Sequence, residues 1–366
     1  MIKASSVLGV TGIALICACG GPAAPSARVP VRTDPVQLGD GWSLSTLAEA
    51  SIDATRMETL ARRISSGEFG LIDSVTIARD GRLCFDAYFN GDASIVHELQ
   101  SVTKSVTSAL IGLAIARGAL PDVRRPVVDV LPEYAEAARS DPAKAAIRID
   151  HLLTMSSGMD WDESTAISDP RNILAQMNQS ADWVAFVSSR RAIEPPGTRF
   201  VYNSGGVILL GAIVRTATGQ DVAQFAADNL FTPMGISDAR WSRNPSHPEQ
   251  IHTGGGLSLR ARDQAKFGQA YLADGVWAGQ RVLPASWVRE STTPKLPAAD
   301  GAQYGYLWWL RSVPGALDVA EAWGARAQHI FVVRPLNLVV VVNAHDNAQD
   351  AGRQILNEIV ASASPR

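Results

Sequence analysis

The chain has 366 residues, and 46% of them are hydrophobic, so it can bury a substantial core in one large domain or two closely joined ones. Its formal net charge is only −3, and the acidic and basic residues are scattered along the sequence. The sequence has no basic stripe of the kind that binds nucleic acid, so this class of partner is excluded.

The first 19 residues have the composition of an export signal. Lys3 is followed by an uncharged apolar run over 4–18, which is shorter than an ordinary membrane span. The letters I-C-A-C-G-G from residue 16 resemble the lipobox of bacterial lipoproteins, and Cys19 is then the lipidated residue. We therefore expect an exported lipoprotein on the periplasmic face of a bacterial membrane. Its resemblance to sorted lipoproteins suggests the outer membrane. An ordinary cleavable signal peptide with two chance cysteines is the alternative.

Cysteine and histidine usage argues against disulfides and metals. Cys84 is the only cysteine that remains once the signal segment is removed, so an internal disulfide or a cysteine-rich metal site is not expected. The six histidines lie far apart and form no H-E-x-x-H pattern. We predict neither a metal nor a cofactor.

The first elements of the folded part follow a tether. Residues 20–47 are rich in Pro, Ala, Ser and Arg near their start and predict a linker. Apolar residues at helical spacing predict an amphipathic helix over 51–65. Two strands are predicted at 72–78 and 83–89, joined by Asp80-Gly81, a dipeptide typical of hairpin turns.

The middle of the chain has a helical character, and its end returns to strands. Helices broken by Pro and Gly clusters are predicted at 101–117, 181–188, 205–216, 222–230 and 261–272. Three β-branched or aromatic runs predict antiparallel strands at 304–310, 329–333 and 338–343, and a last helix is predicted at 350–361.

This order predicts an α+β fold in which N- and C-terminal segments share one antiparallel sheet flanked by helices. The expected sheet region comprises 48–100 and 302–366, and a mostly helical region at 101–301 is inserted between them. A cleft between the two regions is the natural place for chemistry.

A candidate nucleophile opens the helix predicted at 101–117. Ser101 and Lys104 lie three residues apart on one helix face, near enough for the amine to reach the hydroxyl. A lysine can take the serine proton if desolvation or nearby positive charge lowers its pKa from about 10.4. The backbone N–H of Ser101 can form half of an oxyanion hole. Alone, S-x-x-K is a common chance pattern, and a solvated lysine is the alternative.

A second element delivers a phenol. The letters E-P-P-G-T at 194–198 form a turn that leads to Tyr202 and Asn203, just before the helix predicted at 205–216. A phenol there can carry a proton to or from Ser101 if a nearby ammonium stabilises the phenolate. A core aromatic with a satisfied hydroxyl is the alternative for Tyr202. Asn203 is a candidate substrate-binding residue.

The two elements, in this order, resemble the serine β-lactamase and penicillin-recognising family. The similar branch contains class C β-lactamases, D-alanyl-D-alanine carboxypeptidases, esterases and 6-aminohexanoate-dimer hydrolases. Further similar stretches are H-L-L-T-M-S-S-G at 151–158, with Met155 in place of the usual histidine, G-G-G-L at 254–257 and Y-G-Y-L-W-W at 304–309. The resemblance covers roughly 71–361 and implies a Ser–Lys–Tyr acyl-transfer site on an α/β plus all-α fold.

The third motif of that family, K-T-G or H-x-G, is where this chain departs. The matching region at 323–329 lacks the cationic first residue and the final glycine. The resemblance implies that Gln328 supplies the second oxyanion N–H. Arg326 is a candidate for the missing cation, although adjacent strand positions point to opposite faces. The letters H-T-G at 252–254 are an alternative, but they run into a helix, so His252 is expected in a loop at the cleft.

The sequence therefore predicts a serine hydrolase that forms an acyl-Ser101 intermediate with a small ester or amide. Lys104 is the expected base, and Tyr202 is expected to protonate the leaving group and later activate water. The chain contains no G-x-S-x-G nucleophile elbow, which argues against an α/β-hydrolase. Trp161 and Trp183 are candidate pocket residues, with core packing as their alternative. The altered third motif makes a true β-lactamase less expected, and the alternative function is a non-catalytic lipoprotein that binds penicillin or cell-wall peptide.

Overall fold

The computed structural model describes residues 32–314, 317–346 and 350–364, and these residues form one compact unit. The expected signal segment at 1–19, its Cys19 and the part of the tether at 20–31 lie outside the described residues. Within the described ranges, no helix combines the length and the apolar character needed to cross a bilayer.

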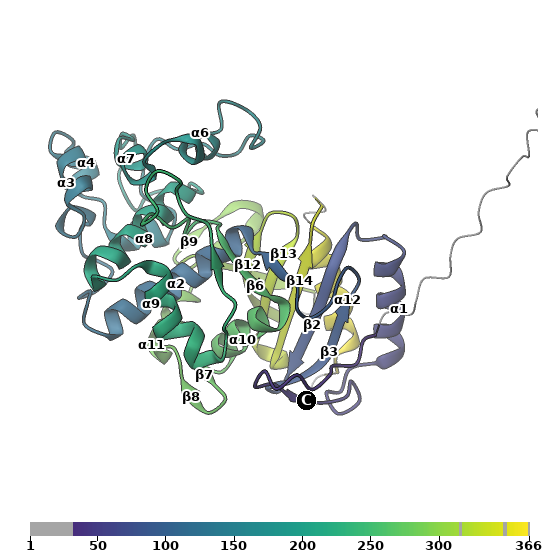
Figure 1. Cartoon of the computed structure of the whole chain (residues 1–366). Helices are drawn as coiled ribbons and strands as arrows, with labels where there is room; N and C mark the ends of the chain where they lie inside the picture. The colour runs from purple at the N-terminus through teal and green to yellow at the C-terminus, as the bar shows by residue number, and fades with distance from the viewer. Residues whose placement is uncertain (1–31, 315–316, 347–349, 365–366) are drawn as a thin grey trace, which may run out of the picture. The chain divides into compact units, whose positions relative to one another are not determined.

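A nine-stranded sheet forms the centre, in the order β1-β3-β2-β14-β13-β12-β11-β10-β9 (Figure 1). Its strands are β1 (Ser43–Leu44), β2 (Ile72–Arg79), β3 (Arg82–Tyr88), β9 (Leu296–Pro297), β10 (Gln303–Tyr304), β11 (Trp309–Val313), β12 (Leu317–Gly324), β13 (Gln328–Val333) and β14 (Leu338–Ala344). β1 runs parallel to β3, and the other neighbours are antiparallel. The predicted α+β fold, with N- and C-terminal segments in one sheet, is confirmed.

Helices cover both faces of this sheet, which explains why its central strands are buried throughout. α1 (Ala54–Ser65) and α12 (Ala351–Ser362) lie on one face (Figure 1). α2 (Thr103–Ala116) and α10 (Ala261–Leu272) lie on the other. Successive side chains of β14 alternate between the two cores, Val339 toward α10 and Val340 toward α12.

The remaining helices pack around α2 and α8. They are α3 (Pro132–Ala138), α4 (Pro142–Ala145), α5 (Ile149–Leu153), α6 (Ile173–Gln179), α7 (Trp183–Ser188), α8 (Ser204–Thr218), α9 (Val222–Ala226) and α11 (Ala285–Ser291). Small ladders join β4 (Val96–Glu98), β6 (Leu257–Arg260) and β5 (Arg240–Trp241), and β7 (Val276–Trp277) with β8 (Gln280–Arg281). Although α10 falls within the stretch expected to form the helical region, it packs on the sheet.

Most predicted elements are confirmed, and the largest differences lie near the C-terminal strands. The predicted hairpin turn is present, with φ values of 53° at Asp80 and 74° at Gly81. The single strand predicted over 304–310 is wrong, because a turn separates β10 from β11. Leu307 in that turn has a φ of 61°, and its N–H bonds the carbonyl of Leu153 in α5. The helix predicted at 222–230 ends as α9 at Ala226 and continues as a wider turn.

Cys84 lies on β3, inside the core between the sheet and α1. Its side chain is buried, and its thiol is free. Burial raises the pKa of this thiol to about 12, so it stays protonated and unreactive at physiological pH.

Candidate active site

Ser101 stands where the chain enters the helical core. It lies in the short 3₁₀ turn Gln100–Val102, which continues directly into α2. Every residue of α2 from Thr103 to Ala114 is buried, so this helix is fixed by packing on all sides. The N–H groups of a first helical turn have no partner within the helix, and they favour negative charge at Ser101.

Lys104 is buried beside this hydroxyl. Its Nζ donates to Ser101 Oγ at 2.8 Å and to the carbonyl oxygen of Gly254 at 2.6 Å. The side chain is 2% exposed, so the alternative of a solvated lysine is wrong. Desolvation lowers the pKa of Lys104 to about 8. A neutral amine is therefore accessible near neutral pH, and it is the form that can accept the serine proton.

Tyr202 joins this pair from the segment before α8. Lys104 Nζ lies 4.8 Å from the centroid of the Tyr202 ring, and the phenol makes a hydrogen-bonding contact with Ser101. Desolvation raises the pKa of Tyr202, the Glu163 carboxylate raises it further, and the Ser101 contact lowers it. The phenol is thus protonated at rest and can act as a proton donor. The three groups predicted from two distant stretches do meet in one place.

Asn203 is the N-terminal cap of α8, a structural role that was not predicted from the sequence. Its Oδ1 accepts from the N–H of Gly206 at 2.8 Å and caps α8. Its backbone N–H points at Met155 Sδ, 3.2 Å away. Its Nδ2 is buried and has no hydrogen-bond partner in the described part of the chain.

Glu163 is a functional candidate that the sequence analysis missed. Its Oε2 accepts from Trp161 Nε1 at 2.7 Å and from the backbone N–H of Ser204 at 3.0 Å, and its Oε1 accepts from Ser204 Oγ at 2.8 Å. Its negative charge raises the pKa of both Lys104 and Tyr202. Nothing in the local sequence distinguishes Glu163 from the acidic residues beside it, because its partners lie on other segments.

The two candidate pocket tryptophans are buried, as the packing alternative expected. Trp161 is 5% exposed and orients Glu163. Trp183 is 4% exposed and meets His252 edge to face, with ring centroids 5.1 Å apart. Both side chains therefore serve core packing, and that of Trp161 also donates a hydrogen bond.

His252 lies in a loop, as predicted, two residues before the carbonyl of Gly254 that holds Lys104. The expectation that this stretch runs into a helix is wrong, because the loop leads into β6. Desolvation and the nearby charge of Lys104 together lower the pKa of His252 to about 4. Its Nε2 lies 3.0 Å from Asn178 Oδ1. A neutral imidazole therefore stands next to the base.

The β12–β13 hairpin forms the sheet side of the site, and here the sequence analysis needs correction. A Cβ atom on Gly324 would lie 2.4 Å from the carbonyl oxygen of Leu99 and 3.0 Å from the backbone nitrogen of Ser101. Gly324 therefore occupies the place of the motif glycine that the sequence analysis found missing. The hairpin is short, so this glycine ends β12 instead of lying on the next strand. Two residues earlier stands Ala322, where the resemblance expects a cation.

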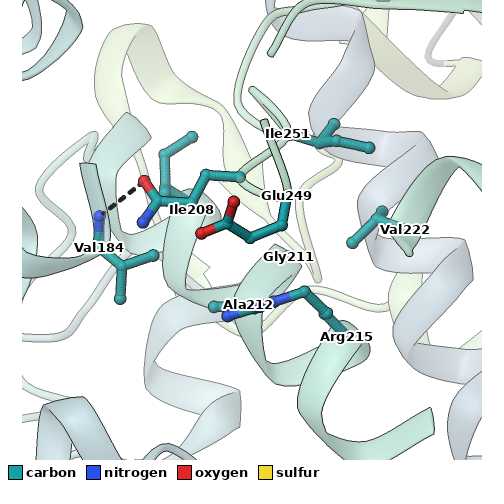
Figure 2. A pocket seen from close by; sticks show the side chains of 9 residues that line it. Val184, Ile208, Gly211, Ala212, Arg215, Val222, Glu249 and Ile251 are labelled. Atoms are coloured by element: carbon teal, nitrogen blue, oxygen red, sulfur yellow. Dashed lines mark hydrogen bonds between the residues drawn. The ribbon is translucent and has the colours of Figure 1, made fainter. Parts of the chain in front are cut away.

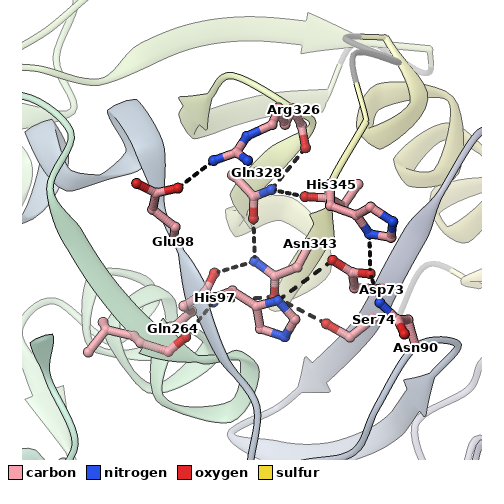
Figure 3. Close-up of polar contacts among 12 residues, drawn as sticks. Asp73, Ser74, Asn90, His97, Glu98, Gln264, Arg326, Gln328, Asn343 and His345 are labelled. Atoms are coloured by element: carbon pink, nitrogen blue, oxygen red, sulfur yellow. Dashed lines mark hydrogen bonds and ion pairs between the residues drawn. The ribbon is translucent and has the colours of Figure 1, made fainter.

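Gln328 and Arg326 occupy other places than those expected. Gln328 is the ladder partner of Gly324, and its side chain turns into a buried polar cluster. Arg326 pairs with Glu98 at the surface instead of joining the Ser101 group (Figure 3). Gly324, not Gln328, is the hairpin residue whose backbone lies against Ser101. The geometry therefore favours the backbone at Gly324 over Gln328 as the source of the second oxyanion N–H.

A pocket in the described part of the chain lies apart from the residues around Ser101. A small pocket between α7, α8 and α9 is lined mainly by aliphatic side chains, with Arg215 and Glu249 at its edge (Figure 2). It shares no residue with the group around Ser101. Among residues 32–314, 317–346 and 350–364, no three His, Cys, Asp or Glu side chains gather in a way that could hold a metal ion.

Comparison with known proteins agrees with this geometry. The family model described as Beta-lactamase matches residues 71–364. The chain is 26% identical to 6-aminohexanoate-dimer hydrolase of Paenarthrobacter ureafaciens over 281 residues, which cover 70% of this chain and 68% of that protein. It is 27% identical to esterase EstB of Burkholderia gladioli over 246 residues, which cover 62% of this chain and 60% of that protein.

A solved structure shows the same fold over most of the chain. This is a Bacillus anthracis protein proposed to be a 6-aminohexanoate-dimer hydrolase, with a TM-score of 0.72 and 18% identity. The match covers 90% of this chain and 89% of that one. At this identity the likeness concerns the fold alone.

Proposed function

The chain belongs to the beta-lactamase family, and we propose from this membership that it is a serine hydrolase cleaving a small ester or amide through an acyl-Ser101 intermediate. The observation that carries the proposal is the contact of the buried Lys104 amine with Ser101 Oγ at 2.8 Å, under the ring of Tyr202. A nucleophile, a base with a lowered pKa and a phenolic acid are the parts that acyl transfer needs.

In the first half of the reaction, neutral Lys104 takes the proton of Ser101 as Oγ attacks the substrate carbonyl carbon. The carbonyl π pair moves onto oxygen, and the N–H of Ser101 together with an N–H of the hairpin at Gly324 holds the oxyanion. Collapse expels the alcohol or amine, which takes a proton from Tyr202. Lys104 then returns its proton to the phenolate.

In the second half, water attacks the acyl carbon, and Tyr202 takes the water proton as it passes its own phenolic proton to neutral Lys104. The second tetrahedral intermediate collapses and releases the acid, and the departing Ser101 Oγ takes its proton back from Lys104. Apart from the substrate and water, these steps use only side chains and backbone N–H groups of this chain.

The charges near Ser101 favour substrates without a carboxylate beside the scissile bond. Ala322 stands where related enzymes are expected to carry a cation, and Glu163 is the acid whose charge reaches Lys104 and Tyr202. An anionic substrate group is therefore repelled rather than held. The name of esterase EstB among the relatives supports an ester substrate.

The direct test compares p-nitrophenyl butyrate with a fluorescent β-lactam. We expect steady turnover of the ester and little reaction with the β-lactam, and Ser101→Ala should abolish turnover. Slow labelling by the β-lactam without ester turnover would instead identify a penicillin-binding protein. Hydrolysis by Ser101→Ala at the parent rate would refute the nucleophile assignment.

We further propose that the enzyme is held at the periplasmic face of a bacterial membrane through lipid on Cys19. The lipobox-like letters at 16–19 and the Pro-rich tether that follows support this proposal. In a bacterial host, Cys19→Ser should lose radiolabelled palmitate and move from the membrane fraction to the soluble fraction. Equal palmitate incorporation in both proteins would contradict lipidation at Cys19.

A further inference from the structure

The hairpin beside Ser101 has a backbone that needs support. Between β12 and β13 the chain turns within three residues, and both Arg326 and Ala327 adopt positive φ, 60° and 51°. Residues with a Cβ atom avoid this region because of steric contact with the neighbouring carbonyl. Other groups must therefore hold the turn in this shape.

The support comes from the side chain of Gln328. Its Nε2 donates to the carbonyl of Arg326 at 2.9 Å and also to the carbonyl of Ala344 (Figure 3). Its Oε1 accepts from Asn343 Nδ2 at 2.9 Å. Gln328 is 2% exposed and Asn343 is fully buried, so water does not compete for these bonds.

Asn343 extends this network into the sheet and α10. Its Oδ1 accepts from Ser74 Oγ at 3.1 Å and from Gln264 Nε2 at 3.2 Å. Its Nδ2 also donates to Gln264 Oε1 at 3.0 Å. The amide groups of Gln328, Asn343 and Gln264 are thus all hydrogen-bonded, which is what a buried polar network requires to specify one arrangement.

A second link joins the hairpin to the segment that carries the nucleophile. The Arg326 guanidinium pairs with Glu98 on β4, and this strand runs directly into the turn that holds Ser101. The hairpin is therefore held from beneath by the amide network and at its surface by an ion pair. Gly324 fits between them, against the backbone of Ser101.

We propose that Gln328 and Asn343 are positioning residues that set the hairpin backbone for oxyanion stabilisation at Ser101. This inference rests on the proposed acyl-transfer function. Gln328 acts through its side chain, by fixing the carbonyl of Arg326 and hence the turn that follows Gly324. Oxyanion donors must lie about 2.7–3.1 Å from the developing charge, so a small displacement of the turn removes their effect.

The test compares Gln328→Met with Gln264→Met, because each removes one amide from the same network and only the first touches the hairpin. For p-nitrophenyl butyrate, we expect Gln328→Met to lower kcat about 10- to 100-fold with little change in KM. Gln264→Met should lose a similar amount of thermal stability but keep kcat near the parent value. A parent-like kcat in Gln328→Met, or equal kcat losses in both variants, would overturn the proposal.

A rescue experiment addresses the turn itself. Glycine adopts positive φ without steric cost, so Ala327→Gly in the Gln328→Met background should restore part of the lost kcat. Failure of this rescue would show that Gln328 does not act through the turn. Ester turnover by the parent and its loss in Ser101→Ala are measured alongside, so failure of the proposed function is recognised separately.

Discussion

The helical side and the sheet side of the site hold their groups by different means. Ser101 and Lys104 lie on consecutive turns of one helical segment, whose hydrogen bonds are local and whose flanks are buried. On the sheet side, Gly324 is set against Ser101 by a hairpin whose shape depends on amides from β13 and β14. The nucleophile and its base are thus determined locally, whereas the wall that faces them depends on contacts between distant segments.

On the helical side of the site, the largest loss of activity is expected when the base, Lys104, is replaced. Lys104→Met should lower kcat/KM by about 10²–10⁴-fold, because no other group takes the serine proton. Lys104→Arg is the matched control, since it keeps the positive charge but cannot release a proton near neutral pH. Steady-state kinetics that show both variants equally impaired would establish the base. An active Lys104→Arg would show that only charge is needed.

Removal of the phenol should have a smaller effect that depends on the leaving group. Tyr202→Phe should lower kcat/KM for an alkyl ester or amide by about 100-fold, because an alkoxide or amine must be protonated as it leaves during acylation. The kcat/KM for p-nitrophenyl butyrate, which also reports acylation alone, should fall much less, since p-nitrophenolate leaves without a proton. Tyr304→Phe, in the same aromatic cluster beside Trp309, is the control and should be close to the parent. Equal losses on both substrates would contradict the acid role.

The dependence of kcat/KM on pH tests the helical side further, because it reports the protonation state of Lys104. The active form of the base is neutral and its pKa is about 8, so kcat/KM should rise with pH and level off above this value. Glu163 raises that pKa, so Glu163→Gln should move the rising limb to lower pH. Ser204→Ala keeps the carboxylate and removes one of its hydrogen bonds, and its limb should stay in place. If Glu163→Gln left the rising limb of the pH profile in place, the proposed effect of Glu163 on the pKa of Lys104 would be refuted.

The smallest effect is expected at the surface of the hairpin. Arg326→Ala removes an ion pair with Glu98 whose two side chains are both substantially exposed, and such pairs contribute about 0–1 kcal/mol. Chemical denaturation should therefore show a change within that range, and kcat should remain within about twofold of the parent. A large loss of kcat would show that the ion pair, more than the buried amides, holds the hairpin.

The local character of the helical side explains why it could be predicted from sequence. Helical spacing places Ser101 and Lys104 on one face whatever surrounds them. The turn before α8 fixes Tyr202 at a helix start, with Asn203 as its cap. The central strands were predictable for a similar reason, since a run of valines such as β14 suits a strand covered on both faces.

The sheet side could not be predicted because its determinants are spread over the chain. β12 carries charged and small residues, and its Glu321 is neutralised by Arg311, His329 and Arg353 from three other elements. A sequence pattern does not reveal such pairing, so the strand was missed and the motif glycine was sought one strand too late. Glu163 was missed for the same reason, because its role depends on Ser204 and Trp161 in the folded chain.

Because the thiol of Cys84 is buried, a fluorescent label can be attached to a cysteine introduced on the β12–β13 hairpin without labelling Cys84. Protein produced from residue 20 onward has Cys84 as its sole cysteine, and this thiol is shielded between the sheet and α1. A single cysteine introduced at the exposed Ala325 would then be the one site open to a maleimide fluorophore. Its emission during turnover would report directly on the loop that borders the reacting carbonyl, with no background from the native chain.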